Sequence, residues 1–238
     1  MNPNSALIWL PALEAAGLPT PNTIIVPYNH GACLSIFDGD HSDEFERLCA
    51  AVLKAAGEIG FPVFIRTDLT SAKHSGPKAY KIENATDNPL AIGETLEDTE
   101  MKTWMDRDGG AQAILVREFL TLESPFTAFS NFPVSREFRF FADRERCLCW
   151  HPYWPEDAIE DHRPSRDDWR ELLADLQRTP ENIAELSAMA ISAVRACGGD
   201  AWSVDICRDT SGKWWITDMA RAEDSFHWEG CPNERVIR

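Results

Sequence analysis

The stretch FPVFIRTDLTSAKHSGPKAYKI, residues 61–82, joins an apolar strand to a group of basic residues. Its opening, FPVFIR, predicts a buried strand that ends at Arg66, because aromatic and β-branched residues favour strands. A polar segment rich in Ser, Gly and Pro follows, and AYKI predicts the returning strand of a hairpin. Lys73 and Lys81 follow Arg66 at separations at which the hairpin brings all three cations to one site. The alternative is a solvated basic loop, and this stretch alone leaves both interpretations open.

The rest of the chain is acidic, which makes this basic group informative. The 238 residues include 23 Lys and Arg against 39 Asp and Glu, a formal net charge of −16. A surface of that sign repels nucleic-acid phosphates and anionic membranes, so nucleic acid is a disfavoured partner. A local basic pocket still suits a nucleotide, because its triphosphate is strongly anionic. The chain is long enough for one large domain or two small lobes, either with a substantial core.

Compartment and redox state are indicated by what the sequence contains at its start and by its cysteines. No run of about 20 apolar residues predicts a membrane span. The first residues lack a basic leader, so we expect no signal peptide. The seven cysteines are odd in number and scattered, and Cys147 and Cys149 do not have the spacing of a zinc knuckle or a thioredoxin motif. Reduced thiols in a cytoplasmic protein are therefore predicted.

Helical periodicity and strand-forming runs alternate along the chain. Helices are predicted over residues 5–17, 42–57, 166–177 and 180–197, with a weaker pattern over 90–105. The helix over 42–57 opens on a polar cap and is expected to close at Gly57. The strands are predicted in TIIVPY, FPVFIR, AILVREFL, SREFRFFAD, AWSVDIC and KWWITDMA. Helices mixed with at least three hairpins predict an α+β fold with two lobes rather than a doubly wound sheet.

Alternation along the late strands shows which polar residues share a face. SREFRFFAD places Arg139 on the face opposite its phenylalanines, and AWSVDIC places Asp205 opposite the apolar residues of its strand. In KWWITDMA, Asp218 is expected to share its face with Trp214 and Ile216. A carboxylate in the middle of a sheet needs a partner, because an isolated buried charge is too costly.

Two such carboxylates on adjacent strands, Asp205 and Asp218, would repel each other unless a cation lies between them. A hard divalent cation with oxygen ligands meets this need, and magnesium with a phosphate is the usual setting. The alternative is a pair of salt bridges to nearby arginines such as Arg208 or Arg221. The residues alone leave both alternatives open.

Two common nucleotide motifs are missing, since the sequence has neither G-x-x-x-x-G-K-[ST] nor G-x-G-x-x-G. Instead GLPTPNT precedes the first strand, and FPVFIR with its basic loop, ILVREFL, SREFRFF, VDI and ITDMA follow in that order. This order resembles the ATP-grasp superfamily. There a Gly-Leu-Pro-x-Pro type of segment, a phosphate-binding strand, an acidic hinge that holds adenine, and late acidic residues for magnesium follow one another.

The closer resemblance is to the branch in which Arg replaces the first phosphate-binding Lys, which includes the cell division cycle protein 123 family. It is carried by FIRTDLTSAKHS, ILVREFL, SREFRFF, HPYWPED and the late WSVDIC and WWITDMA blocks. It implies a two-lobed ATP-grasp fold with the nucleotide bound between antiparallel sheets. It further implies an N-terminal pre-ATP-grasp-like segment at 1–60, a small lobe with lid and hinge at 61–120, and a C-terminal lobe with the metal-binding strands at 121–238.

The resemblance implies a role for each candidate residue. The residues that would hold the ATP phosphates, or form the hinge beside adenine with a carboxylate near the ribose, are Arg66, Lys73, Lys81, Arg117, Glu118, Phe119 and Leu120. Glu137 and Arg139 would lie on the floor of the cleft. Arg139 and Lys73 would be catalytic, Arg139 by reaching a phosphate or an acyl-phosphate intermediate. Asp205 and Asp218 would bind Mg²⁺.

One departure from the pattern concerns the metal site. Many ATP-grasp enzymes end in an acidic-x-Asn triplet whose Asn is a metal ligand, whereas this chain has Asp218, Met219 and Ala220 there. Asp224 and Ser225 are the candidates to replace it. The departure bears on full ligase activity more than on nucleotide binding.

Two functions of different classes follow from the resemblance. The first is an ATP- and magnesium-dependent ligase that activates a carboxylate as an acyl phosphate for attack by an amine, with an unidentified substrate. The second is a nucleotide-dependent assembly factor with an unidentified protein partner. The cell division cycle protein 123 family is linked to assembly of eukaryotic translation initiation factor 2, but that partner is not carried over to this shorter chain. Action on RNA ends is disfavoured by the net charge.

Overall fold

The computed structural model describes residues 2–29, 33, 42–71, 80–103, 110–229 and 231. The chain divides into two compact units, one formed by residues 1–2 and 21–120 and the other by residues 3–20 and 121–238. Each unit contains helices and an antiparallel sheet, which confirms the predicted α+β class. Within the part of the chain that is described, no helix combines the length and apolar character needed to cross a bilayer.

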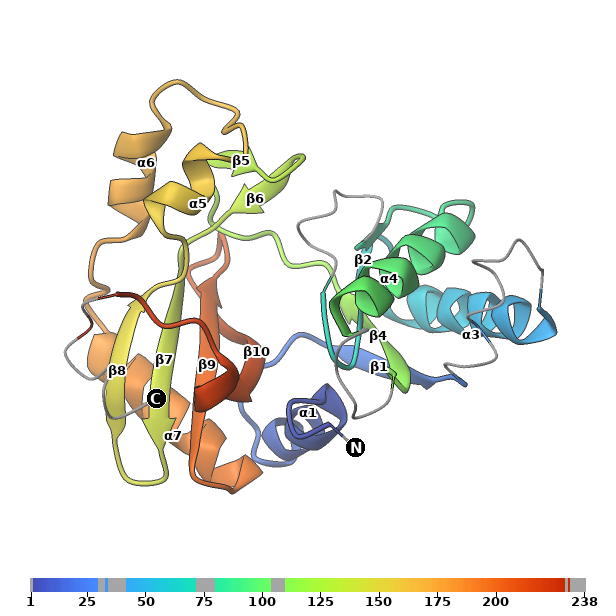
Figure 1. The fold of residues 1–238 in the computed structure, drawn as a ribbon, viewed down its shortest axis with the longest axis horizontal. Coiled ribbons are helices and arrows are strands. Elements are labelled where there is room, and N and C mark those ends of the chain that lie inside the picture. The colour runs from blue at the N-terminus through green and yellow to red at the C-terminus, as the bar shows by residue number, and fades with distance from the viewer. Residues whose placement is uncertain are drawn as a thin grey trace. The chain divides into compact units, whose positions relative to one another are not determined.

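The first unit is a four-stranded sheet with helices on one face (Figure 1). The strands lie in the order β1 (Thr23–Pro27), β4 (Ala113–Glu118), β2 (Val63–Thr67) and β3 (Lys81–Ile82), and every neighbouring pair is antiparallel. Helices α3 (Asp43–Ile59) and α4 (Asn88–Thr103) pack against the strands. Val63 lies opposite Ile82 and Phe64 opposite Lys81, which confirms the predicted hairpin between FPVFIR and AYKI.

Alternation along the strands decides which face the helices cover. Val63, Ile65, Ile82, Ile114 and Val116 are fully buried and belong to one core cluster with residues of α3 and α4. They are every second residue of β2, β3 and β4, so the residues between them project to the other face. That other face therefore carries Arg66, Lys81 and Arg117.

Helix α3 shows how local sequence sets an element's ends. Ser42 is the N-cap, and its hydroxyl accepts a hydrogen bond from the Phe45 backbone N–H at 3.1 Å. The expected stop at Gly57 is wrong, because the helix continues to Ile59. Gly60 ends it instead: it has φ of 101°, and its N–H donates to the Ala56 carbonyl. A positive φ of this kind costs glycine little, which is why it closes helices.

The cap gives a testable prediction about stability. Ser42→Ala is expected to lower the free energy of unfolding of the first unit by about 1 kcal/mol, because one backbone donor at the start of α3 loses its partner. The measurement is the urea midpoint, followed by a probe in that unit. The matched control is Ser192→Ala, since the Ser192 hydroxyl is exposed and only bonds back to Ala188 within its own helix. Equal midpoints for the two variants would contradict the prediction.

The second unit is built on a sheet with strand order β10 (Trp214–Arg221), β9 (Ala201–Arg208), β7 (Glu137–Asp143) and β8 (Cys147–Pro152), all antiparallel. Helix α7 (Ile183–Cys197) packs on β7, β8 and β9, and α1 (Ala6–Ala15) packs on α7 (Figure 1). The remaining elements are β5 (Phe126–Ala128), β6 (Phe132–Val134), α5 (Glu156–Glu160), α6 (Trp169–Leu176) and the 3₁₀ turn η3 (Ala222–Asp224).

The two faces of this sheet differ in character. Phe138, Phe140, Val204 and Ile206 are fully buried, and they alternate with the polar residues of β7 and β9. Phe141, which belongs to the polar set, contacts His227 of the segment that follows η3. The apolar set therefore faces α7, and the opposite face carries the polar residues under the C-terminal segment.

The two units share the predicted parts of the chain unequally. Residues 21–60 supply β1 and α3 to the same unit as residues 61–120, whereas α1 packs with the second unit. The three-part division at residues 60 and 120 was drawn from the family resemblance and stays a prediction.

Candidate functional site

A row of polar side chains crosses the sheet of the second unit, one from each strand. His151 of β8 lies opposite Arg139 of β7, Arg139 lies opposite Asp205 of β9, and Asp205 lies opposite Asp218 of β10. Residues directly opposite in an antiparallel pair project to the same face, with Cβ atoms about 5 Å apart. The structure thus brings together three of the predicted site residues, together with His151, on the polar face.

The centre of the row is a two-pronged ion pair. Arg139 donates from Nε to Asp205 Oδ1 at 2.7 Å and from Nη2 to Asp205 Oδ2 at 2.8 Å. The side chain of Asp205 is 4% exposed and that of Arg139 is 15% exposed. Charge-assisted pairs of this fork geometry fix both groups in direction as well as in distance. Asp205 is therefore oriented and charge-compensated by a neighbour on the adjacent strand.

Arg139 has two further contacts that hold its plane. Its Nη1 donates to the carbonyl of Phe226 at 3.3 Å, and its guanidinium lies 4.8 Å from the centre of the Tyr153 ring. Burial alone would lower the pKa of Arg139, but the Asp205 carboxylate outweighs it and the net shift is upward, with Asp218 contributing in the same direction. The guanidinium stays charged at any accessible pH, as a permanent cation beside the two carboxylates.

The position of Asp218 corrects the sequence-based expectation. Regular alternation would have placed Asp218 with Trp214 and Ile216, but the register shifts between Ile216 and Asp218. Ile216 lies opposite Ile206 on the apolar face, whereas Asp218 lies opposite Asp205. A β-bulge inserts one extra residue, which moves every later side chain of the strand to the other face. The two carboxylates face each other only because of this bulge.

The alternative partners named from sequence have other contacts. Arg208 pairs with Glu123, Nη1 to Oε2 at 3.3 Å, and Arg221 stacks 4.4 Å from the centre of the Trp202 indole. The partner of Asp205 is Arg139, which sequence reasoning had assigned to a phosphate. The signal for the pair was the order of the strands, and alternation within one strand does not reveal it.

The carboxylates fit a hard cation. A carboxylate has about four lone-pair positions, so a bidentate arginine leaves the remaining ones of Asp205 for a metal ion. Oxygen ligands from two opposed carboxylates suit Mg²⁺, which binds one or two carboxylates and keeps several waters. Arg139 lowers the net charge of the group, from two carboxylates to one negative charge, before any metal binds.

The position of the missing Asn ligand lies beside this group. Ala220 lies opposite Ser203, whose hydroxyl is within hydrogen-bond distance of the Ser225 hydroxyl at 2.5 Å. The carboxylate of Asp224 accepts a hydrogen bond from Asn4 Nδ2 at 2.8 Å, so it is directed to the N-terminal segment. Of the two proposed replacements, Ser225 lies near the Ala220 position and Asp224 is used elsewhere.

Glu137 lies on the same face, one position along. It begins β7 two residues before Arg139, lies opposite Cys207, and is 8% exposed. Its backbone carbonyl accepts from the Tyr153 N–H at 2.9 Å, which holds the tyrosine beside Arg139.

In the first unit, the predicted cations share the face that the helices leave uncovered. Lys81 lies opposite Phe64, and Phe64 lies opposite Arg117, so these three form one row across β3, β2 and β4. Arg66 belongs to the next row, opposite Leu115. Arg66 is 3% exposed, and its Nε donates to the Thr67 carbonyl at 3.0 Å. The sheet therefore presents three cations on one side.

The predicted hinge follows β4 directly. The Glu118 carboxylate accepts from the Asn22 N–H at 2.8 Å, which ties the end of β4 to the start of β1. Lys81 Nζ lies 4.6 Å from the centre of the Phe119 ring and pairs with Glu83 at 2.5 Å. Leu120 is the last residue of the first unit. Lys73 lies outside the described residues. The convergence of the two groups of residues in one crevice stays a prediction.

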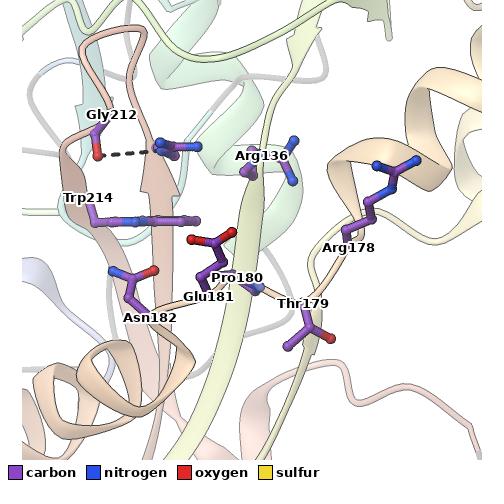
Figure 2. A pocket seen from close by; sticks show the side chains of 9 residues that line it. Arg136, Arg178, Thr179, Pro180, Glu181, Asn182, Gly212 and Trp214 are labelled. Atoms are coloured by element: carbon purple, nitrogen blue, oxygen red, sulfur yellow. Dashed lines mark hydrogen bonds between the residues drawn. The ribbon is translucent and has the colours of Figure 1, made fainter.

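An arginine-lined pocket in the second unit lies apart from the polar row. Its volume is about 460 Å³, and Figure 2 shows Arg136, Arg178 and Trp214 around it, with the start of α7. Arg136 Nε pairs with Glu123 at 2.9 Å, and Arg178 pairs with Asp175 at 3.1 Å. Trp214 lies opposite Arg208 on the apolar face of the sheet. The guanidinium charges here are compensated, and the pocket is on the face opposite Arg139 and Asp205.

His151 at the end of the polar row gives a pH prediction. Burial lowers its pKa to about 4, and the charges of Arg139 and His227 lower it further, against the Pro152 carbonyl and Asp205. Between pH 6.5 and 4 the unfolded chain binds a proton at His151 that the folded chain does not. Stability should therefore be flat above pH 6.5 and fall below it, by about 3 kcal/mol near pH 4.

The measurement is the urea midpoint against pH for the wild type and for His151→Phe, which keeps a ring against Trp228. The phenylalanine variant should lose less stability between pH 6.5 and 4, because this histidine no longer titrates. His162→Phe is the control, since the His162 ring is exposed. A wild type and His151→Phe variant with parallel profiles would refute the prediction.

The comparisons with known proteins agree with this architecture. The model of the ATP-grasp domain, family 3 of the clade named for one arginine and two lysines, matches residues 39–225, well over half of the chain. The protein therefore belongs to that arginine-and-two-lysine clade of the ATP-grasp superfamily, as the ordered motifs indicated.

Solved structures support the same fold. Cdc123 from Schizosaccharomyces pombe superposes with a TM-score of 0.61 at 12% identity, covering 97% of this chain and 91% of that one. Carboxyaminoimidazole ribonucleotide synthase from Aspergillus clavatus, solved with ATP, has a TM-score of 0.52 at 10% identity and covers 92% of this chain and 44% of that one. At these identities the likeness establishes the fold alone.

A curated relative matches over a short segment. D-alanine–D-alanine ligase from Halorhodospira halophila is 46% identical over 41 residues, which is 17% of this chain and 14% of that enzyme. The chain spans a small part of this ligase and less than half of the synthase. Their activities are therefore considered only as proposals for this chain.

Proposed function

We propose that this protein binds ATP with Mg²⁺ and uses it to activate a carboxylate as an acyl phosphate, which an amine then attacks. The observation that carries the proposal is the pair of opposed carboxylates, Asp205 and Asp218, on the polar face of the second sheet in an ATP-grasp chain. Mg²⁺, held by these two residues, would neutralise the phosphate charge and orient the terminal phosphate.

The cations of the first unit take the other half of the work. Arg66, Lys81 and Arg117 share one face, and we assign Arg66 and Lys81, with Lys73, to the phosphates. The backbone at Glu118, Phe119 and Leu120 would hold adenine. These groups accelerate the reaction by position and charge, and no side chain of the protein needs to form a covalent bond.

In the reaction, a carboxylate oxygen of the substrate attacks the γ-phosphorus and ADP leaves. The amine then attacks the acyl carbon, and phosphate leaves as the amide forms. Arg139 already carries a permanent positive charge beside Asp205, so it is suited to take up negative charge that develops on the transferred phosphoryl group. Glu137 lies two residues away on the same face, which would form the floor of the cleft.

The experiment measures ATP binding first and turnover second. Isothermal titration with ATP should show binding that requires Mg²⁺ and is lost with EDTA. ADP release should then rise when a panel of amino acids and small carboxylic acids is added together with amines. Binding without stimulation by any member of a broad panel would count against the ligase and leave the nucleotide site intact.

A second candidate is a nucleotide-dependent assembly factor with little turnover. Two observations favour it: the likeness to Cdc123 covers nearly the whole of both chains, and Ala220 stands where many ATP-grasp enzymes have a metal-binding Asn. The protein would then use ATP to hold a conformation that a partner recognises. A pull-down in which a specific protein is retained with Mg-ATP and released with EDTA, without ADP formation, distinguishes it from the ligase.

A further inference from the structure

Outside the ATP-grasp residues, two thiols and an imidazole meet under the C-terminal segment. Cys149 comes from β8, and His227 and Cys231 come from the chain after η3, which crosses the polar face of the sheet (Figure 1). Their ligand atoms all lie within 4.8 Å of one another. Cys149 Sγ is 2.8 Å from His227 Nε2. The sequence separation of 78 residues shows that tertiary folding assembles this group.

The surroundings hold the group in place and keep it from water. Cys149 and His227 are 8% and 5% exposed. Phe141 packs edge-on against the His227 ring at 4.5 Å, and Cys149, Phe141 and Ala222 form a small apolar cluster against which Cys231 packs. The Cys231 N–H donates to the Trp228 carbonyl at 3.3 Å, so a turn places the last two ligands together. Packed rotamers of this kind lower the cost of assembling a binding site.

The ligand atoms define the chemistry of the occupant. Thiolate and imidazole suit Zn²⁺ and other thiophilic metals, whereas Mg²⁺ takes oxygen. Two thiolates neutralise a divalent ion, which suits a site this buried. In tetrahedral zinc sites neighbouring S and N ligand atoms are about 3.5 Å apart, so Cys149 and His227 need to separate by about 0.7 Å. Three protein ligands leave the fourth position for water or another ligand.

We propose that Cys149, His227 and Cys231 bind a zinc ion that fastens the C-terminal segment to the sheet. On binding, the two thiols release their protons to solvent and the metal enters as Zn²⁺, with no change of oxidation state. The fastened segment includes Phe226, whose carbonyl accepts from Arg139, so the metal also fixes one contact of the polar row. The inference rests on these residues alone and is independent of the proposed ligase activity.

Two arrangements compete with the metal. One is a thiol–imidazole hydrogen bond between Cys149 and His227 without an ion. The other is a disulfide between Cys149 and Cys231, although both cysteines are free in the structure. Neither competitor uses all three residues at once, and each predicts a different result.

The test measures metal content of the full chain, purified with reductant and loaded with zinc before gel filtration. Mass spectrometry of metals should find about one zinc per chain. Cys149→Ser and Cys231→Ser should each retain at least about tenfold less. Cys147→Ser is the matched control and should keep its zinc, because its thiol is on the same strand but bonds to Ser187 of α7. Cobalt in place of zinc should give a thiolate charge-transfer band in the wild type and in the control, and no such band in the two ligand variants.

A second readout follows the segment itself. Hydrogen exchange of residues 222–229 should accelerate when a chelator removes the metal, and Cys231→Ser should show the fast exchange from the start. If Cys149→Ser fails to fold, Cys231→Ser and the chelated wild type carry the test, since Cys231 is only half-buried. Zinc-free wild type after loading, a Cys149–Cys231 disulfide in the reduced preparation, or unchanged metal content in Cys231→Ser would each overturn the proposal.

Discussion

Asp205→Asn is expected to abolish magnesium-dependent ATP binding, raising the Kd for Mg-ATP by at least about 100-fold. It is a deeply buried member of the carboxylate pair and the direct partner of Arg139. The amide cannot supply the negative charge that a metal requires, and it leaves the guanidinium without its counter-ion. The same change should lower the free energy of unfolding by about 3–5 kcal/mol, because one charge of a buried pair remains uncompensated. Titration calorimetry and urea denaturation measure the two effects.

The two effects are separated by a second variant. Arg139→Met combined with Asp205→Leu replaces the ion pair by apolar side chains of similar size, which is often neutral for stability. This double variant should fold nearly as well as the wild type and still fail to bind Mg-ATP. Asp143→Asn is the single-site control, because that carboxylate accepts from the backbone of Glu145 and Arg146 in a turn. Normal ATP binding by the double variant would show that the pair is structural only.

Arg66→Met is expected to weaken ATP binding by about 10- to 100-fold, which corresponds to the loss of one charge-assisted contact. Arg66 lies on the uncovered face of the first sheet with Lys81 and Arg117, in an otherwise acidic chain. Methionine keeps much of the side-chain volume and removes only the guanidinium. Arg66→Lys should recover part of the affinity, since it restores the charge without the two-pronged geometry.

The control for Arg66 applies the same substitution on the same unit. Arg47→Met removes an arginine of α3 that is 72% exposed and pairs with Glu44 within the helix. It should leave ATP affinity within about twofold of the wild type, because surface ion pairs contribute little. Equal affinities for Arg66→Met and Arg47→Met, with both variants folded, would exclude Arg66 from the nucleotide site.

Alternation within single strands was predictable from the sequence and proved right wherever the strand is regular. It separated Arg139 from Phe138 and Phe140, and it placed Asp205 opposite the apolar face of β9. Strand pairing between FPVFIR and AYKI was predictable for the same reason, since a hairpin involves neighbours along the chain. Local periodicity and short-range connections are properties of consecutive residues.

Strand order and irregularity were beyond such reasoning. That Arg139 lies opposite Asp205, 66 residues away, depends on which strands pair in the finished sheet. The bulge that turns Asp218 toward Asp205 depends on how β10 is fitted against β9. Gly57 and Gly60 were both possible ends for α3, and the backbone φ of Gly60 decided between them.

The sequence by itself determined the α+β class, the ordered ATP-grasp motifs, and the identity of the charged residues on each strand. Only the tertiary structure decided their partners: Asp205 with Arg139, Asp218 turned by a bulge, and Cys149 with His227 and Cys231. The physical reason is that periodicity is encoded over a few residues, whereas the contacts of a buried charge or thiol depend on packing between segments far apart in the chain.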